Sequence, residues 1–143
     1  MTPKLISGES YKDDRGILNF NNSFNLSLIK RIYTIENKNT SFIRRWQGHK
    51  IEQRWFTATS GKFEIQLILV DNWNGPSADL KRITFELVDE TLDVLHIPPG
   101  YISSIQSLED NSKLLIMSDY ELNEIKDEYK FLVDYFKKKE RKL

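Results

Sequence analysis

The sequence contains no cysteine, so neither a disulfide nor a thiolate metal site can form. Its 21 basic and 21 acidic residues cancel, so no overall field draws the chain to nucleic acid or to an anionic membrane. No stretch approaches the roughly 20 apolar residues needed to span a bilayer, and the N-terminus lacks the apolar run of a secretion signal. These absences predict a cytoplasmic protein with no nucleic-acid or membrane partner.

What is present predicts a single folded domain. The 143 residues suit one domain with one hydrophobic core. Hydrophobic residues make up 39% of the chain and charged residues 29%, which is the composition of a globular protein and not of a disordered one.

Short segments of alternating polar and apolar residues, separated by turn residues, predict that most of the chain is β-strand. The expected strands are 17–20, 28–35, 42–58, 62–70, 83–88, 94–97 and 114–117. Ser60 and Gly61 form a turn suited to joining two antiparallel strands, and residues 71–77 read as a loop. This pattern predicts an all-β sandwich or barrel over residues 1–120.

The end of the chain differs in character. Apolar residues recur there at helical spacing: Leu122, Ile125, Tyr129, Leu132, Val133 and Phe136. They predict a C-terminal helix and basic tail over residues 121–143, belonging to the same domain. The basic end suits a solvated helix terminus, and the alternative is a contact with membrane or nucleic acid.

Two segments resemble the paired signatures of the cupin superfamily, in which histidines and a carboxylate hold a metal. The corresponding residues here are Gln47, His49, Arg54 and Gly61 in the first segment, and Pro98, Gly100 and Ser103 in the second. Of the four ligand positions only His49 suits a metal, and Arg54 would place a permanent cation there. We therefore predict no metal and no cofactor, and a pocket of Arg45, Arg54 and His49 that takes an anionic or many-hydroxyl ligand.

Within the cupins the chain more closely resembles the WxcM-like nucleotide-sugar 3,4-ketoisomerases. The resemblance rests on the order and spacing of segments 14–16, 29–33, 44–50, 60–61, 97–100 and 118–120. The loop at 72–77 and the segment 97–101 also resemble the 3,5-epimerases of dTDP-rhamnose synthesis. The resemblance implies a double-stranded β-helix, or jelly-roll barrel. It also implies a homodimer with strands paired across subunits, and a dTDP-linked 4-keto-6-deoxysugar as substrate in deoxysugar or surface-polysaccharide biosynthesis.

The same resemblance suggests residue roles. The ketoisomerase pattern is Arg-Gly-x-His-x-His-Lys, and this chain has Gln47 at the first histidine and His49 at the second. Glutamine cannot exchange protons near neutral pH, so His49 is predicted to transfer the proton while Gln47 donates a hydrogen bond to an oxygen. The predicted substrate-binding residues are Arg45, Arg54, Tyr33, Tyr101 and Ser103. The tyrosine of the epimerase pattern is missing from 113–118, so an ordinary 3,5-epimerase is disfavoured.

A second hypothesis is a non-catalytic cupin that binds a nucleotide sugar or another carbohydrate, and the missing first histidine is its main support. Individual residues also have structural interpretations. A single histidine on a strand is commonly packed or hydrogen-bonded, and His96 is expected to be of that kind. The arginines of 44–54 could pair with Glu52 or Glu64 on neighbouring strands, and the tryptophans could fill core.

Overall fold

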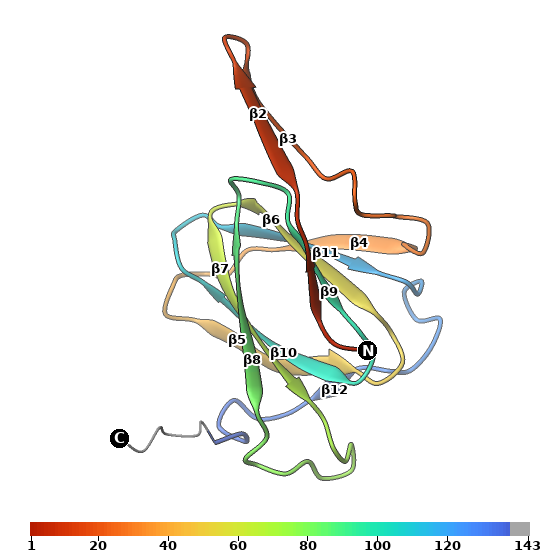
Figure 1. The fold of residues 1–143 in the computed structure, drawn as a ribbon. Helices are drawn as coiled ribbons and strands as arrows, with labels where there is room; N and C mark the ends of the chain where they lie inside the picture. Colours follow the sequence, from red (N-terminus) through yellow and green to blue (C-terminus); the bar gives the residue numbers. More distant parts are fainter. Residues whose placement is uncertain (138–143) are drawn as a thin grey trace.

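Two five-stranded antiparallel sheets face each other in the structure, a computed structural model that describes residues 1–137 (Figure 1). The first sheet has the order β1 (Lys4–Ile6), β9 (Val94–Ile97), β6 (Arg54–Ser60), β11 (Lys113–Ser118) and β4 (Arg31–Ile35). The second has the order β12 (Tyr129–Lys130), β5 (Ile43–His49), β10 (Tyr101–Ser107), β7 (Lys62–Leu69) and β8 (Arg82–Val88). Strands β2 (Glu9–Asp13) and β3 (Gly16–Phe20) form a separate hairpin that projects from the body (Figure 1).

The main core fills the gap between the two sheets. Strand alternation directs every second side chain into this gap, as the sequence of β7 illustrates with Phe63, Ile65 and Leu67, all fully buried. Phe56 of β6 and Ile116 of β11 approach from the opposite sheet. Each such side chain contributes about 1.5–3 kcal/mol to folding, so the register of both sheets is strongly specified.

The outer faces of the sheets are covered by chain segments that precede and follow the sheets. Phe24 and Ile29 pack on the outer face of the first sheet, against Trp55. Phe131 and Phe136 pack on the outer face of the second sheet. Both sheets are therefore buried on two faces over part of their area.

The all-β fold is confirmed, but two finer predictions are wrong. The sheets are not closed into a barrel by hydrogen bonds: edge strand β4 lies across a polar cavity from β5, and the side chains lining it separate the two sheets. The predicted C-terminal helix is absent from the described residues 121–137, which run as turns around the short strand β12. Their aromatic side chains pack on the second sheet, so tertiary packing outweighs helical spacing here. Residues 138–143, which contain most of the predicted basic tail, lie outside the described residues.

The structure also differs from the sequence-based expectation for two strands. The expected strand 42–58 is two strands, β5 and β6, joined by a turn at 50–53. Strand β10, which was not expected, lies between β5 and β7 at the centre of its sheet. Within residues 1–137 no helix is long and apolar enough to cross a membrane.

Candidate active site

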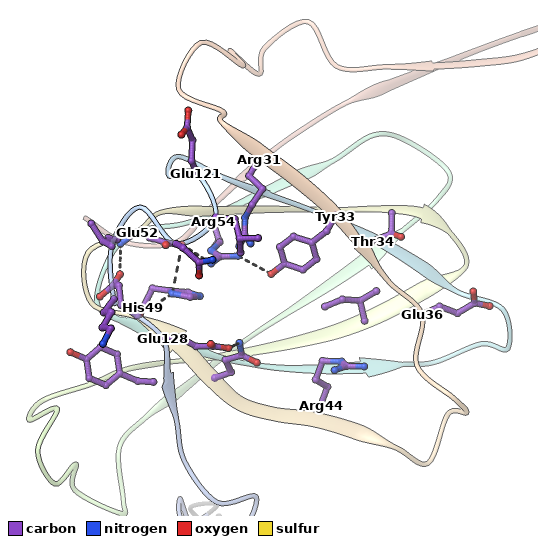
Figure 2. Close-up of a pocket in the computed structure, with 18 residues that line it drawn as sticks. Arg31, Tyr33, Thr34, Glu36, Arg44, His49, Glu52, Arg54, Glu121 and Glu128 are labelled. Carbon is purple, nitrogen blue, oxygen red and sulfur yellow. Dashed lines mark hydrogen bonds and ion pairs between the residues drawn. The ribbon is translucent and has the colours of Figure 1, made fainter.

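A polar cavity of about 960 Å³ opens between edge strand β4, the end of β5 and residues 121–129 (Figure 2). A smaller cavity of about 50 Å³ continues from it between the sheets, where Phe56 and Ile97 of the core form part of the wall. The gap between the sheets is thus apolar over most of its area and polar at the end where β4 and β5 diverge.

Arg54 is the buried cation of the large cavity, with only 6% of its surface exposed. Its Nη2 lies 2.5 Å from Glu52 Oε2, and its Nη1 donates to the hydroxyl of Tyr33 at 2.7 Å. The Ser118 hydroxyl donates to the same Glu52 oxygen at 3.2 Å. A charged pair this deep requires such added hydrogen bonds to offset its desolvation. Because the Tyr33 oxygen accepts from Arg54, its own proton remains free to be donated (Figure 2).

His49 is oriented by the backbone of the segment that follows the sheets. Its Nδ1 lies 2.9 Å from the carbonyl oxygen of Asp127, which can only accept, so Nδ1 carries the proton. Nε2 therefore holds a lone pair, and the ring is directed into the cavity (Figure 2). Burial lowers the pKa of His49 below 6.5, and the nearby Arg54 cation lowers it further, against the opposing effect of Glu52. A neutral imidazole with a free Nε2 is a proton acceptor at neutral pH.

The carboxylate of Asp127 holds the turn between β5 and β6. It is 3% exposed and accepts three consecutive backbone N–H groups, from Lys50 at 3.0 Å, Ile51 at 2.8 Å and Glu52 at 2.7 Å. Its carbonyl oxygen binds His49 at the same time. Asp127 therefore fixes both His49 and the start of the Glu52–Arg54 pair.

Gln47 lies two residues before His49 on the same face of β5, and its amide Nε2 donates to Glu128 Oε1. The pairing of β12 with β5 places Lys130 opposite Gln47 and Tyr129 opposite Gly48. Gly48 is required by close packing, because a Cβ there would lie 2.2 Å from the carbonyl oxygen of Tyr101 on β10. The residues after the sheets thus form one wall of the cavity.

His49, Glu52 and Asp127 form one group of possible metal ligands, with ligand atoms within 4.8 Å of one another. Their donor atoms do not fit a divalent ion well. Both Asp127 oxygens accept backbone N–H groups, and Glu52 Oε2 is bound to the Arg54 guanidinium. A metal at this point would face a permanent cation and displace existing hydrogen bonds.

The structure brings most of the predicted site residues to one place. Gln47, His49, Arg54 and Tyr33 line the large cavity. Tyr101 and Ser103 line only the smaller inner cavity, where burial raises the pKa of the Tyr101 hydroxyl.

The predicted position of Arg45 is wrong. On β10, Ser103 pairs with Gln47 while the next residue, Ser104, pairs with Arg45, so Trp46 is an extra residue in β5. Such a bulge reverses the alternation on one side of it. Arg45 consequently lies on the outer face, where it donates to Ser104 at 2.9 Å, and Arg44 lines the cavity instead.

His96 lies on the outer face of the first sheet, away from the cavity. Its Nε2 is 2.7 Å from Gln53 Oε1, and its ring stacks on Trp55 with centroids 5.1 Å apart. Gln53 is in turn held by the carboxylate of Asp119. Burial lowers the pKa of His96 as well.

Sequence reasoning missed four residues of the site: Arg44, Glu52, Asp127 and Glu128. The sequence indicates Glu52 only as an ion-pair partner of the arginines. Asp127 and Glu128 fall in the segment whose spacing predicted a helix, and they contact residues 75 to 81 positions earlier. No local pattern indicates contacts over that separation.

A search of curated protein sequences gives no match. Among solved structures, a mutant of the 3,4-ketoisomerase QdtA from Thermoanaerobacterium thermosaccharolyticum in complex with TDP-4-keto-6-deoxyglucose is similar, with a TM-score of 0.71 and 20% identity over 94% of this chain and 91% of that one.

Two further structures share the fold. A 3,4-ketoisomerase from Helicobacter canadensis has a TM-score of 0.64 and 25% identity over 87% of each chain. The dTDP-4-dehydrorhamnose 3,5-epimerase of Bacillus anthracis has a TM-score of 0.72 and 14% identity over 92% of this chain and 79% of that one. Residues 1–139 match the sequence model of the family described as FdtA, WxcM-like, C-terminal, and the chain belongs to this family.

Proposed function

We propose that this protein is a 3,4-ketoisomerase of a nucleotide-linked 4-keto-6-deoxysugar that works by proton transfer through His49, without a metal or another cofactor. The observation that carries the proposal is the free Nε2 of a neutral His49 in a polar cavity, next to the donors of Arg54 and Tyr33. Such an arrangement provides a base for the proton beside a carbonyl and donors for the oxyanion that forms.

The family relationship supports the substrate class. Solved relatives in this fold are 3,4-ketoisomerases and 3,5-epimerases, and one of them was crystallised with TDP-4-keto-6-deoxyglucose. Arg31, Arg44 and Lys126 line the same cavity here, and guanidinium and ammonium groups suit the diphosphate of a nucleotide sugar. A dTDP-linked sugar is therefore the proposed substrate, converted in the cytoplasm during deoxysugar or surface-polysaccharide biosynthesis.

Each polar residue has a place in the proposed reaction. His49 takes the proton from the carbon next to the carbonyl. Gln47 and Arg54, with Tyr33, donate hydrogen bonds to the sugar oxygens, on which the negative charge develops. Tyr101 and Ser103 are proposed to contact the part of the sugar that reaches the inner cavity. Arg45 has no part in this proposal, because it lies on the outer face.

We further propose that the two sheets form a cupin-type jelly roll and that the protein is a homodimer with strands paired across subunits. The projecting hairpin β2–β3 and edge strand β4 support this proposal, because Ile17, Leu18 and Ile32 are each more than 60% exposed. Apolar side chains gathered on unpaired strand edges favour association. Light scattering of the purified protein measures the mass, and a monomer at micromolar concentration would contradict the dimer.

The second candidate function is binding of a nucleotide sugar without turnover, because Gln47 occupies the place of a histidine in the ketoisomerase pattern. The two functions separate when the protein is incubated with dTDP-4-keto-6-deoxyglucose in deuterated water and the sugar is followed by NMR. A ketoisomerase yields the 3-keto isomer and places deuterium at carbon 3 of the substrate or carbon 4 of the product. His49→Ala should abolish both the isomerisation and the deuterium exchange. Binding of the sugar with neither product nor exchange would instead establish the binding function.

A further inference from the structure

The proposed reaction needs two proton movements, and only the movement between the carbons has so far been assigned, to His49. Carbon 3 of the sugar loses a proton and carbon 4 gains one, while the hydroxyl proton on the carbon 3 oxygen moves to the carbon 4 oxygen. His49 supplies one titratable group in the cavity. Gln47, which shares its face of β5, cannot exchange a proton near neutral pH.

Glu128 lies where a second titratable group is needed. It lines the cavity, and its Oε1 accepts the hydrogen bond from Gln47. The Nζ of Lys130 also lies 3.8 Å from the same Oε1. These contacts orient the carboxylate and leave Oε2 to meet a ligand.

The other carboxylates of the cavity are less suited to this work. Glu52 is paired with Arg54, and Asp127 accepts three backbone N–H groups. Glu36 and Glu121 are drawn apart from His49 (Figure 2), whereas Glu128 binds Gln47 and directly follows Asp127, whose carbonyl oxygen binds His49. The Glu128 carboxylate is engaged through Oε1, so its Oε2 is placed to meet a sugar hydroxyl in the cavity.

We propose that Glu128 is a second proton-transfer residue of this site, carrying the hydroxyl proton between the two sugar oxygens; this rests on the ketoisomerase function proposed above. His49 Nε2 takes the proton from carbon 3. The electron pair of the broken C–H bond forms a double bond between carbon 3 and carbon 4, and the π electrons of the carbonyl move onto the carbon 4 oxygen. Glu128 takes the proton of the carbon 3 hydroxyl and delivers it to the carbon 4 oxygen.

The negative charge thereby passes to the carbon 3 oxygen. An electron pair of this oxygen forms the new carbonyl at carbon 3. The electrons of the double bond then take the proton from His49 at carbon 4. Both residues end in their starting protonation states. No oxidant or reductant is required, because the bonds broken and formed balance within the sugar.

Glu128→Gln tests this role because it keeps the size and hydrogen bonding of the side chain and removes its titration. The variant is incubated with dTDP-4-keto-6-deoxyglucose in deuterated water, and NMR follows both the 3-keto product and the deuterium at carbon 3 of the remaining substrate. We expect product formation to slow by about 100-fold or more, the lower range of the effect of a general acid–base group. Deuterium exchange at carbon 3 should persist at a rate comparable to that of the unaltered protein, because His49 still removes that proton.

Glu86→Gln is the matched control. The Glu86 side chain is 56% exposed and pairs with a lysine at 3.1 Å, much as Glu128 is 55% exposed beside Lys130, but it lies on β8 away from the cavity. This variant should isomerise like the unaltered protein.

Isomerisation by Glu128→Gln at the unaltered rate would overturn the role of Glu128 alone. Equal loss of exchange and isomerisation would also overturn it, since Glu128 would then support the carbon proton transfer or the shape of the site. If the unaltered protein neither isomerises nor exchanges, the proposed function itself fails.

Discussion

The strand faces that look into the gap between the sheets and the faces that look outward carry different kinds of polar group. At the open end of the gap, His49 and Arg54 point into a cavity with hydrogen-bonding capacity left for a ligand. On the outer faces, His96 and Arg45 have side-chain partners, Gln53 and Ser104. His49 and His96 show this difference most clearly, because burial lowers the pKa of both although only His49 faces the cavity.

A lowered histidine pKa therefore does not by itself mark an active site in this protein. Burial lowers the pKa of His96, but its ring stacks on Trp55 and its Nε2 is already engaged by Gln53. His49 differs in having its Nδ1 proton fixed by a carbonyl and its Nε2 open to the cavity. Geometry, and not burial, separates a base from a packing residue.

The largest difference in activity is expected between variants of the two histidines. His49→Ala should lower kcat/KM for dTDP-4-keto-6-deoxyglucose by about 100- to 10,000-fold, the range for loss of a general base. His96→Asn should leave kcat/KM close to that of the unaltered protein and cost about 1 kcal/mol of unfolding free energy through its lost contacts. Steady-state kinetics and urea unfolding measure these quantities, and an equal loss of activity in both variants would break the contrast.

The next effect concerns the two aspartates that hold the ends of the turn between β5 and β6. Asp127→Asn should lower kcat by about tenfold or more through displacement of His49, and should cost about 1–3 kcal/mol of stability because buried N–H groups lose their acceptor. Asp119→Asn, which disturbs Gln53 on the outer face, should reduce stability and leave kcat unchanged. If Asp127→Asn had full activity, Asp127 would not position His49.

A smaller effect is expected from the neighbouring arginines on the two faces of β5. Arg44→Met should weaken the binding of dTDP by about tenfold, the equivalent of 1.4 kcal/mol, because it removes a cation from the cavity. Arg45→Met should bind dTDP as the unaltered protein does. Isothermal titration calorimetry measures both affinities, and the reverse result would show that the bulge at Trp46 does not direct Arg44 to the ligand.

The smallest effects concern pH. Because the pKa of His49 in the folded protein lies below 6.5, kcat/KM should hold as the pH falls to 6.5 and decline only below it. For stability, the unfolded chain binds more protons than the folded one between the lowered pKa values and 6.5, so unfolding free energy rises with pH there and is lost on acidification.

His96→Asn should flatten this dependence of stability on pH without moving the acid limb of the pH profile of kcat/KM. Chemical unfolding at several pH values and a pH–rate profile together make the comparison. A shift of the acid limb in the His96 variant would mean that the outer face reaches the chemistry.

Much of the architecture could be predicted from local patterns. Alternation in β7 indicated which side chains enter the core, and the spacing of Gln47, His49 and Arg54 indicated residues that do line one cavity. Local patterns failed where the chain departs from regular geometry. The extra residue Trp46 exchanged the faces of Arg44 and Arg45, and nothing in the neighbouring residues signals a bulge.

By itself the sequence determined the all-β class, the family and the small set of polar residues at the end of β5 and the start of β6. These follow from alternation and spacing, which act between residues close in the chain. Only the tertiary structure decided that residues 121–129 wall the cavity and that Asp127 and Glu128 reach His49 and Gln47. Contacts between residues so far apart in the chain form because the aromatic side chains of 131–136 are buried on the second sheet. The free energy of this burial depends on the tertiary structure, so no local pattern predicts it.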